Sequence, residues 1–197
     1  MLGLSERDLK KDATTLAGTT ILGTLVVIFD YSMKFSGLKI PFPWLPYLKF
    51  DFTGVPIVLS LLLFGLTSGT TTSTVAFLAI LARSGDLVGA AMKALAEFST
   101  ILGMTFAIKL SKKNTKITKI SSLILGVSSR SIIMFFANLI IFPQMAVILT
   151  SPLTVVFNVI QGSISIISGY FLYGIIVRKT SFLTLKNERF ESAKDVK

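Results

Sequence analysis

Five polar side chains stand within long apolar stretches of the chain, where they could bind a ligand. They are Glu97, Arg130, Asn138, Asn158 and Gln161. A charged or amide group inside a membrane is costly unless it is paired or faces a polar cavity. Asn158 and Gln161 are three residues apart and share one face of a helix, and their amides offer donors and acceptors that suit the edge of a flat heterocycle. With Asn138 they favour a ligand pocket, although such amides can also simply join helices together.

The two charged residues of this set can be arranged in more than one way. Glu97 and Arg130 can form a buried ion pair between helices, or they can hold a polar substituent of a ligand, with Arg130 binding a negative group. Lys93 comes four residues before Glu97 and can pair with it along one helix, which would leave Arg130 free. The sequence leaves these arrangements open.

Composition shows what surrounds these residues. The chain of 197 residues is 52% hydrophobic and only 15% charged, with its apolar residues in long blocks, which indicates an integral membrane protein. It contains no cysteine and no histidine, which excludes thiol nucleophiles, disulfides, the usual zinc ligand sets and an imidazole base. We therefore predict no enzyme activity, no metal and no cofactor. The basic residues behind the net charge of +10 flank the apolar blocks, so they indicate membrane topology and no nucleic-acid partner.

About 20 helical residues cross a bilayer core of roughly 30 Å, and this length predicts an all-α bundle of six membrane helices. The predicted spans are 13–33, 55–66, 70–82, 87–110, 120–142 and 153–177. Residues 37–51 contain three prolines and several aromatic residues, which predict an ordered loop at the membrane interface between the first two helices.

The boundaries of three of these spans depend on particular residues. The stretches 55–66 and 70–82, separated by residues 67–69, form either two short helices or one broken helix. Pro143 and Pro152 are expected to separate the last two spans. Asp86 is expected to cap the helix 87–110.

The distribution of Lys and Arg orients the bundle, because basic residues near spans are retained on the cytoplasmic side. With six spans, the N-terminal segment, the connection 109–119 and the C-terminal tail fall on one side and carry most of the 20 basic residues. We therefore predict a cytoplasmic segment 1–12, a single transmembrane substrate-binding domain 13–177 and a cytoplasmic basic tail 178–197. Both termini are then cytoplasmic, in a multi-pass protein of the plasma membrane.

Four segments resemble the S components of energy-coupling factor (ECF) vitamin transporters, and the riboflavin type most closely. Residues 42–56, FPWLPYLKFDFTGVP, are similar to that family's aromatic-proline loop followed by Leu-Lys-hydrophobic-Asp-Phe-Ser-Asp-hydrophobic-Pro. Residues 64–69, FGLTSG, resemble its Phe-Gly-Pro-x-x-Gly, with Leu66 in place of the proline. Residues 138–143, NLIIFP, resemble its Asn-aromatic-x-x-x-Pro, and residues 157–162, FNVIQG, its Phe-Asn-x-x-Lys-Gly. The likeness extends from Ala13 to Lys179.

The resemblance implies a vitamin-binding subunit that works with a transmembrane coupling subunit and two cytoplasmic ATPases. Gln161 replaces the family's lysine, so the expected ligand is riboflavin, a related flavin or another heterocycle. Ala13 and Ala17 match the family's Ala-x-x-x-Ala motif, which faces the coupling subunit. No ATP-binding Walker pattern occurs in the chain, so the energy would come from the partners. The candidate substrate-binding residues are Asn138, Asn158, Gln161, Glu97, Arg130, Lys49 and Asp51.

Other hypotheses stay open on the sequence alone. A stand-alone carrier or membrane enzyme would need paired intramembrane carboxylates, whereas we expect Glu97 to be the only acid well inside a span. A purely structural membrane subunit would use the amides as contacts between helices. An S component for a different vitamin is a further alternative.

Overall fold

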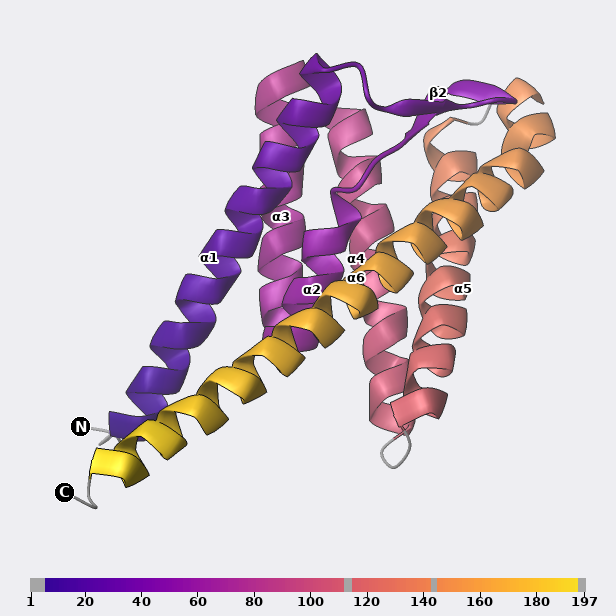
Figure 1. Ribbon diagram of the computed structural model, residues 1–197. Coiled ribbons are helices and arrows are strands. Elements are labelled where there is room, and N and C mark those ends of the chain that lie inside the picture. Colours follow the sequence, from indigo (N-terminus) through magenta and orange to yellow (C-terminus); the bar gives the residue numbers. More distant parts are fainter. Residues whose placement is uncertain (1–5, 112–114, 143–144, 195–197) are drawn as a thin grey trace, which may run out of the picture.

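The computed structural model describes residues 6–111, 115–142 and 145–194. In chain order these residues form α1 (Glu6–Phe35), β1 (Ile40–Phe42), β2 (Leu45–Phe50), α2 (Gly54–Phe64), α3 (Leu66–Ser84), α4 (Leu87–Leu110), α5 (Thr115–Ile141) and α6 (Met145–Lys194). The helices pack as one bundle, with the two strands lying across one end (Figure 1). The start of α1 and the end of α6 lie together at the opposite end (Figure 1). The six-helix bundle predicted from the sequence is therefore confirmed.

Membrane-spanning character is clear for four of the helices. By length and composition α1, α4, α5 and α6 are apolar enough to cross a membrane. Their outward faces carry large exposed hydrophobic side chains, such as Leu16, Ile21, Phe106 and Ile140, which suits a lipid surround better than water. By contrast, α2 has only 11 residues and reaches about 16 Å at 1.5 Å per residue. It is almost wholly buried by its neighbours.

The stretch 55–82 forms two helices that turn back on each other. The Thr72 hydroxyl donates to Ser60 Oγ across the pair at 3.0 Å, which fixes α2 and α3 as antiparallel neighbours. The turn lies at Gly65, whose φ of 92° belongs to the region that favours glycine. The prediction that residues 67–69 separate the two helices is therefore wrong, because these residues already belong to α3.

Of the other predicted boundaries, one is confirmed and one is wrong. α4 begins and ends where predicted, and Asp86 caps it by accepting from the Gly89 N–H at 2.9 Å. However, Pro152 lies inside α6, so the prediction that it separates two spans is wrong. A proline removes one backbone hydrogen bond, a loss that packing against neighbouring helices can offset in a membrane bundle. Pro143, residues 112–114 of the basic connection and the end of the basic tail (195–197) lie outside the described residues.

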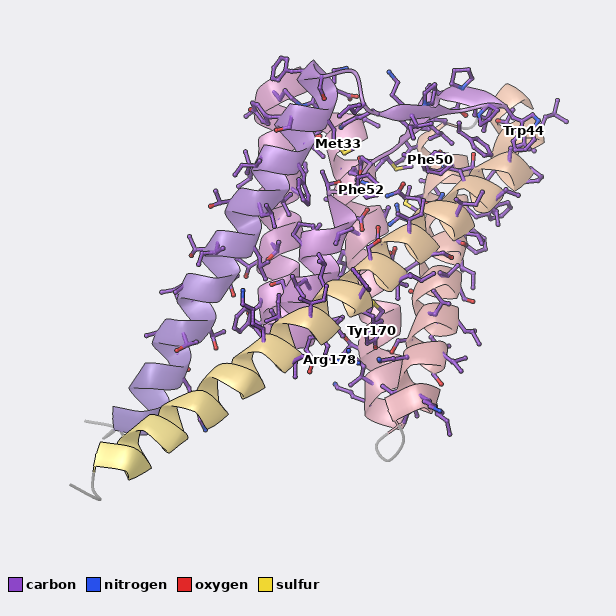
Figure 2. All side chains as sticks on the ribbon, in the orientation of Figure 1. Met33, Trp44, Phe50, Phe52, Tyr170 and Arg178 are labelled. Atoms are coloured by element: carbon purple, nitrogen blue, oxygen red, sulfur yellow. The ribbon has the colours of Figure 1, made fainter. Side chains whose placement is uncertain are left out.

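The predicted interfacial loop is a two-stranded antiparallel hairpin. Ile40 pairs with Phe50 and Pro41 with Lys49, and the register shifts between Pro41 and Phe42. The Phe42 ring packs on Phe157 of α6, with 5.7 Å between centroids. Phe50 also packs on Phe157, at 4.9 Å. These aromatic contacts dock the hairpin on the bundle, and Trp44 lies at its turn beside the start of α6 (Figure 2).

Candidate functional site

A cavity of about 740 Å³ lies beneath the hairpin, within the size range of ligand sites. Its wall comes from the hairpin, the ends of α1 and α3, and the halves of α4, α5 and α6 nearest the hairpin. Apolar contact surface comes from Tyr47, Met92, Met134, Phe142 and Phe157. Five of the seven predicted substrate-binding residues line the cavity: Lys49, Asp51, Arg130, Asn138 and Asn158.

Asp51 connects the hairpin to the helices. Its Oδ1 accepts hydrogen bonds from the Thr53 hydroxyl at 2.6 Å and from Lys93 Nζ at 2.9 Å. Burial alone raises the pKa of Asp51, but Lys93 and the Thr53 hydrogen bond outweigh it, so the pKa lies below its ordinary value. The resulting stabilisation is complete above the ordinary pKa and is lost as the pH falls through the lowered one. The carboxylate is therefore ionised at neutral pH.

Gln161 holds the segment between the hairpin and α2. Its Oε1 accepts from the Asp51 backbone N–H at 3.3 Å, and its Nε2 donates to the Asp51 carbonyl at 2.8 Å. The side chain is fully buried and is not part of the cavity wall. Both polar atoms of the Gln161 side chain therefore form hydrogen bonds with the Asp51 main chain, behind the cavity wall. A direct contact with substrate stays a prediction for this residue.

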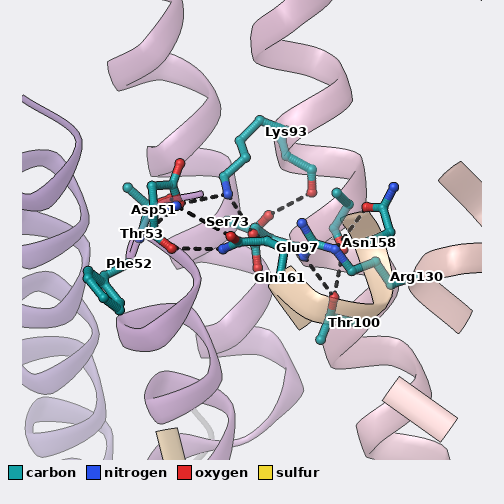
Figure 3. Close-up of polar contacts among 12 residues, drawn as sticks. Asp51, Phe52, Thr53, Ser73, Lys93, Glu97, Thr100, Arg130, Asn158 and Gln161 are labelled. Atoms are coloured by element: carbon teal, nitrogen blue, oxygen red, sulfur yellow. Dashed lines mark hydrogen bonds and ion pairs between the residues drawn. The ribbon is translucent and has the colours of Figure 1, made fainter. Parts of the chain in front are cut away.

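A chain of charged groups links α4 to α5 beside the cavity (Figure 3). Glu97 Oε1 lies 2.9 Å from Lys93 Nζ on the same helix and 3.0 Å from Arg130 Nη1 on α5. Both pairings considered from the sequence are therefore present together, so Arg130 is not left free. Arg130 Nε also donates to Asn158 Oδ1 at 3.1 Å, and Nη1 donates to the Thr100 hydroxyl at 3.2 Å.

The two asparagines share the cavity from successive helices. The Asn158 amide nitrogen donates to the Thr154 carbonyl at 2.9 Å, and the Asn138 amide nitrogen donates to the Met134 carbonyl at 2.8 Å. The side-chain oxygen of Asn138, Oδ1, forms no hydrogen bond with the described residues, so it can accept one from a ligand. Two of the three amides of the pocket hypothesis therefore meet at one cavity, and their contact with a ligand stays a prediction.

Sequence reasoning missed a buried acid near the end of α1. Asp30 is fully buried and holds two cations, Lys39 Nζ at 2.6 Å and Arg83 Nε at 2.6 Å. Glu97 is therefore not the only acid inside a predicted span. The available signal was an acid within an apolar block, followed nine residues later by a lysine in the proline-rich segment. These two ion pairs tie α1, the hairpin and α3 together at the cavity's outer end.

Replacing Asp30 by asparagine is expected to loosen the hairpin, because Lys39 loses its anchor. Lys39 also lies 3.9 Å from Asp51, and this second carboxylate together with water moderates the loss for the hairpin to about 1 kcal/mol. Hydrogen exchange of residues 38–44, followed by mass spectrometry, should become about fivefold faster. Asp12→Asn at an exposed position is the charge-matched control. An unchanged exchange rate would show that the aromatic contacts with Phe157 are enough to hold the hairpin on the bundle.

Ala13 and Ala17 lie on α1 near the end opposite the hairpin, and both are exposed. The neighbouring Gly18 faces inward instead, since a Cβ there would run into the Phe64 ring. The two alanines therefore form part of an outward, small-residue face. Their role in contacting a partner stays a prediction.

No protein-family model matches the chain. The riboflavin transporter FmnP of Bacillus subtilis (strain 168) is 30% identical over 119 residues, which are 58% of this chain and 63% of that transporter. The match thus spans less than two thirds of that relative's length. A solved structure, described as that of the S component of a bacterial ECF transporter, has a TM-score of 0.73 and 27% sequence identity.

That structural match covers 87% of this chain and 98% of the solved chain, so the two share most of their architecture. The relatives found by sequence and by structure are both transport proteins, which groups the chain with transporters and not with enzymes. In sequence and in fold, the chain is therefore similar to the S component of a bacterial ECF transporter and to a riboflavin transporter.

Proposed function

We propose that the chain is the substrate-binding subunit of an ECF-type importer and that it captures a vitamin from outside the cell. A transmembrane coupling subunit and two ATPases would supply the energy for uptake. The support is the combination of an S-component fold with a cavity of about 740 Å³ at the end opposite the termini. If the termini are cytoplasmic, as the basic residues predict, this cavity opens toward the outside.

The ligand we propose is riboflavin or a related flavin. The observation that carries this proposal is the meeting of Asn138 and Asn158, from successive helices, in one cavity that also exposes aromatic and methionine side chains. Amides can pair with the polar edge of a flat ring, while Phe157 and Met134 offer surfaces for its faces. The riboflavin transporter among the relatives points to the same class of ligand.

Purification of the chain in detergent tests the ligand directly. We expect flavin fluorescence to be quenched on binding, and a titration then gives the dissociation constant. Asn138→Ala should weaken riboflavin binding by about 3- to 10-fold, the value of one hydrogen bond between neutral groups. The fold should survive, because the Asn138 amide nitrogen donates its hydrogen bond to Met134 of the same helix.

Ser163→Ala on α6 is the matched control, because the Ser163 hydroxyl bonds back to the Val159 carbonyl and lies outside the cavity wall. It should bind riboflavin as the parent does. A folded parent that binds no flavin would exclude the flavin assignment, and a thermal-shift screen of other vitamins would then identify the ligand class. Uptake into cells that occurs without co-expressed coupling subunit and ATPases would instead support a stand-alone carrier.

A further inference from the structure

A lysine of α4 enters the cavity where the S-component pattern would place one on α6. Gln161 stands in the position of that lysine, and both of its polar atoms bond to the Asp51 main chain. Lys93 of α4, in contrast, lines the cavity and keeps 18% of its side chain exposed. Sequence reasoning considered Lys93 only as a partner of Glu97.

Two carboxylates hold the Lys93 ammonium group in place. Its Nζ lies 2.9 Å from Asp51 Oδ1 and 2.9 Å from Glu97 Oε1. Each carboxylate is itself fixed: Asp51 Oδ1 also accepts from the Thr53 hydroxyl at 2.6 Å, and Glu97 Oε1 lies 3.0 Å from Arg130 Nη1. The ammonium group is therefore preorganised and would lose little freedom when it binds a ligand.

Glu97 has room beside this cluster because residue 54 is a glycine. A Cβ on Gly54 would lie 2.5 Å from Glu97 Oε2, so a side chain there would displace the carboxylate. The S-component pattern has an aspartate at this position. The chain thus has Gly54 and Gln161 where the pattern has an acid and a lysine, and α4 supplies an acid and a lysine instead, as Glu97 and Lys93.

The ammonium group of Lys93 has one donor left for a ligand. A lysine ammonium carries three N–H donors, and the Asp51 and Glu97 carboxylates take up two of them. No other described residue forms a hydrogen bond or ion pair with Lys93 Nζ. Arg130, the other cation of this cluster, is only 1% exposed, and its guanidinium donates to Asn158 and Thr100.

We propose that Lys93 determines specificity for the ligand by donating its third N–H to a carbonyl oxygen of the ligand's ring. A hydrogen bond from a charged donor is about twice as strong as one between neutral groups, so this contact would exceed one from the amide of Asn138 or Asn158. The inference rests on the proposed flavin-binding function and names the side chain that recognises the ring.

Titrations of the purified chain with riboflavin and with its two thio analogues, in which sulfur replaces one ring carbonyl oxygen, test the inference. Because sulfur accepts hydrogen bonds weakly, the parent should bind one analogue about three- to tenfold more weakly than riboflavin, the usual range for one hydrogen bond. Lys93→Met should bind riboflavin about tenfold more weakly and should no longer discriminate against that analogue. A purely structural role would weaken binding of all three ligands equally, and the cycle of variant and analogue separates the two roles.

The double variant Glu97→Gln/Lys93→Met also lacks the ammonium group but keeps the charge balance of the cluster. It provides a folded protein if Lys93→Met alone is unstable, and it should likewise not discriminate between riboflavin and the analogue. Lys109→Met is the matched control, because Lys109 is an exposed lysine of the same helix outside the cavity wall. It should bind all three ligands as the parent does.

Two outcomes would overturn the inference while leaving the proposed function intact. One is equal binding of riboflavin and both analogues by the parent. The other is discrimination that persists without the Lys93 ammonium group, which would assign the donor to another side chain, such as Asn138 or Asn158. A folded parent that binds none of the three ligands would remove the flavin assignment together with the inference.

Discussion

Replacing Glu97 by glutamine is expected to lower the stability of the purified chain by about 3 kcal/mol, at the low end of the cost of breaking a buried ion pair. The change keeps the shape of the side chain but leaves Lys93 and Arg130 with one carboxylate, Asp51, where there were two. Arg130 is affected most, because it is 1% exposed and Glu97 is its recorded ion-pair partner. Thermal unfolding in detergent, followed by circular dichroism, measures the loss.

A double-mutant cycle separates the charge effect from simple repacking. Lys93→Gln restores neutrality in the Glu97→Gln background, so the double variant should be more stable than the sum of the single effects predicts, by 1 kcal/mol or more, a typical coupling for touching residues. Asp12→Asn removes one negative charge at an exposed position and should leave the unfolding temperature unchanged. Full stability of Glu97→Gln would mean that water already screens the buried cluster.

The helices and much of the site could be predicted because their causes are local. α4 follows from one long, mainly apolar block and an aspartate placed to cap it, and both Asn138 and Asn158 stand out because amides are rare among apolar neighbours. Asp86 caps α4 and thereby fixes where the helix begins. Features that depend on a few adjacent residues could therefore be predicted from the sequence.

The parts that were missed depend on contacts between distant residues. Whether Gln161 faces a ligand or the backbone is decided by Asp51, 110 residues earlier in the chain. Asp30 gains its second cation from Arg83 on another helix, 53 residues later. The hairpin likewise docks on Phe157 of α6, more than 100 residues later in the chain. No local pattern encodes these partners, and only the assembled bundle shows them.

The close contact between α4 and α5 also escaped the sequence, and it leads to the second large prediction. Gly103 of α4 faces the main chain of α5: a Cβ there would run into the Leu125 carbonyl oxygen and would lie 2.8 Å from both the Leu125 carbonyl carbon and Ser129 Cβ. Small residues allow such approach between membrane helices. Because a backbone cannot rotate aside as a side chain does, Gly103→Ala must push the helices apart, at a cost of about 1–3 kcal/mol.

The displacement should reach the site as well, because the Glu97–Arg130 ion pair bridges the same two helices. Gly103→Ala is therefore expected to lower the unfolding temperature in detergent and to weaken ligand binding in the same sample. Gly174→Ala on α6 is the matched control: a Cβ there meets nothing within 4 Å, and alanine favours a helix over glycine by about 1 kcal/mol. It should be neutral or slightly stabilising. Equal stability of the two variants would show that α4 and α5 are not in backbone contact, and that Glu97 and Arg130 are held together by their charges alone.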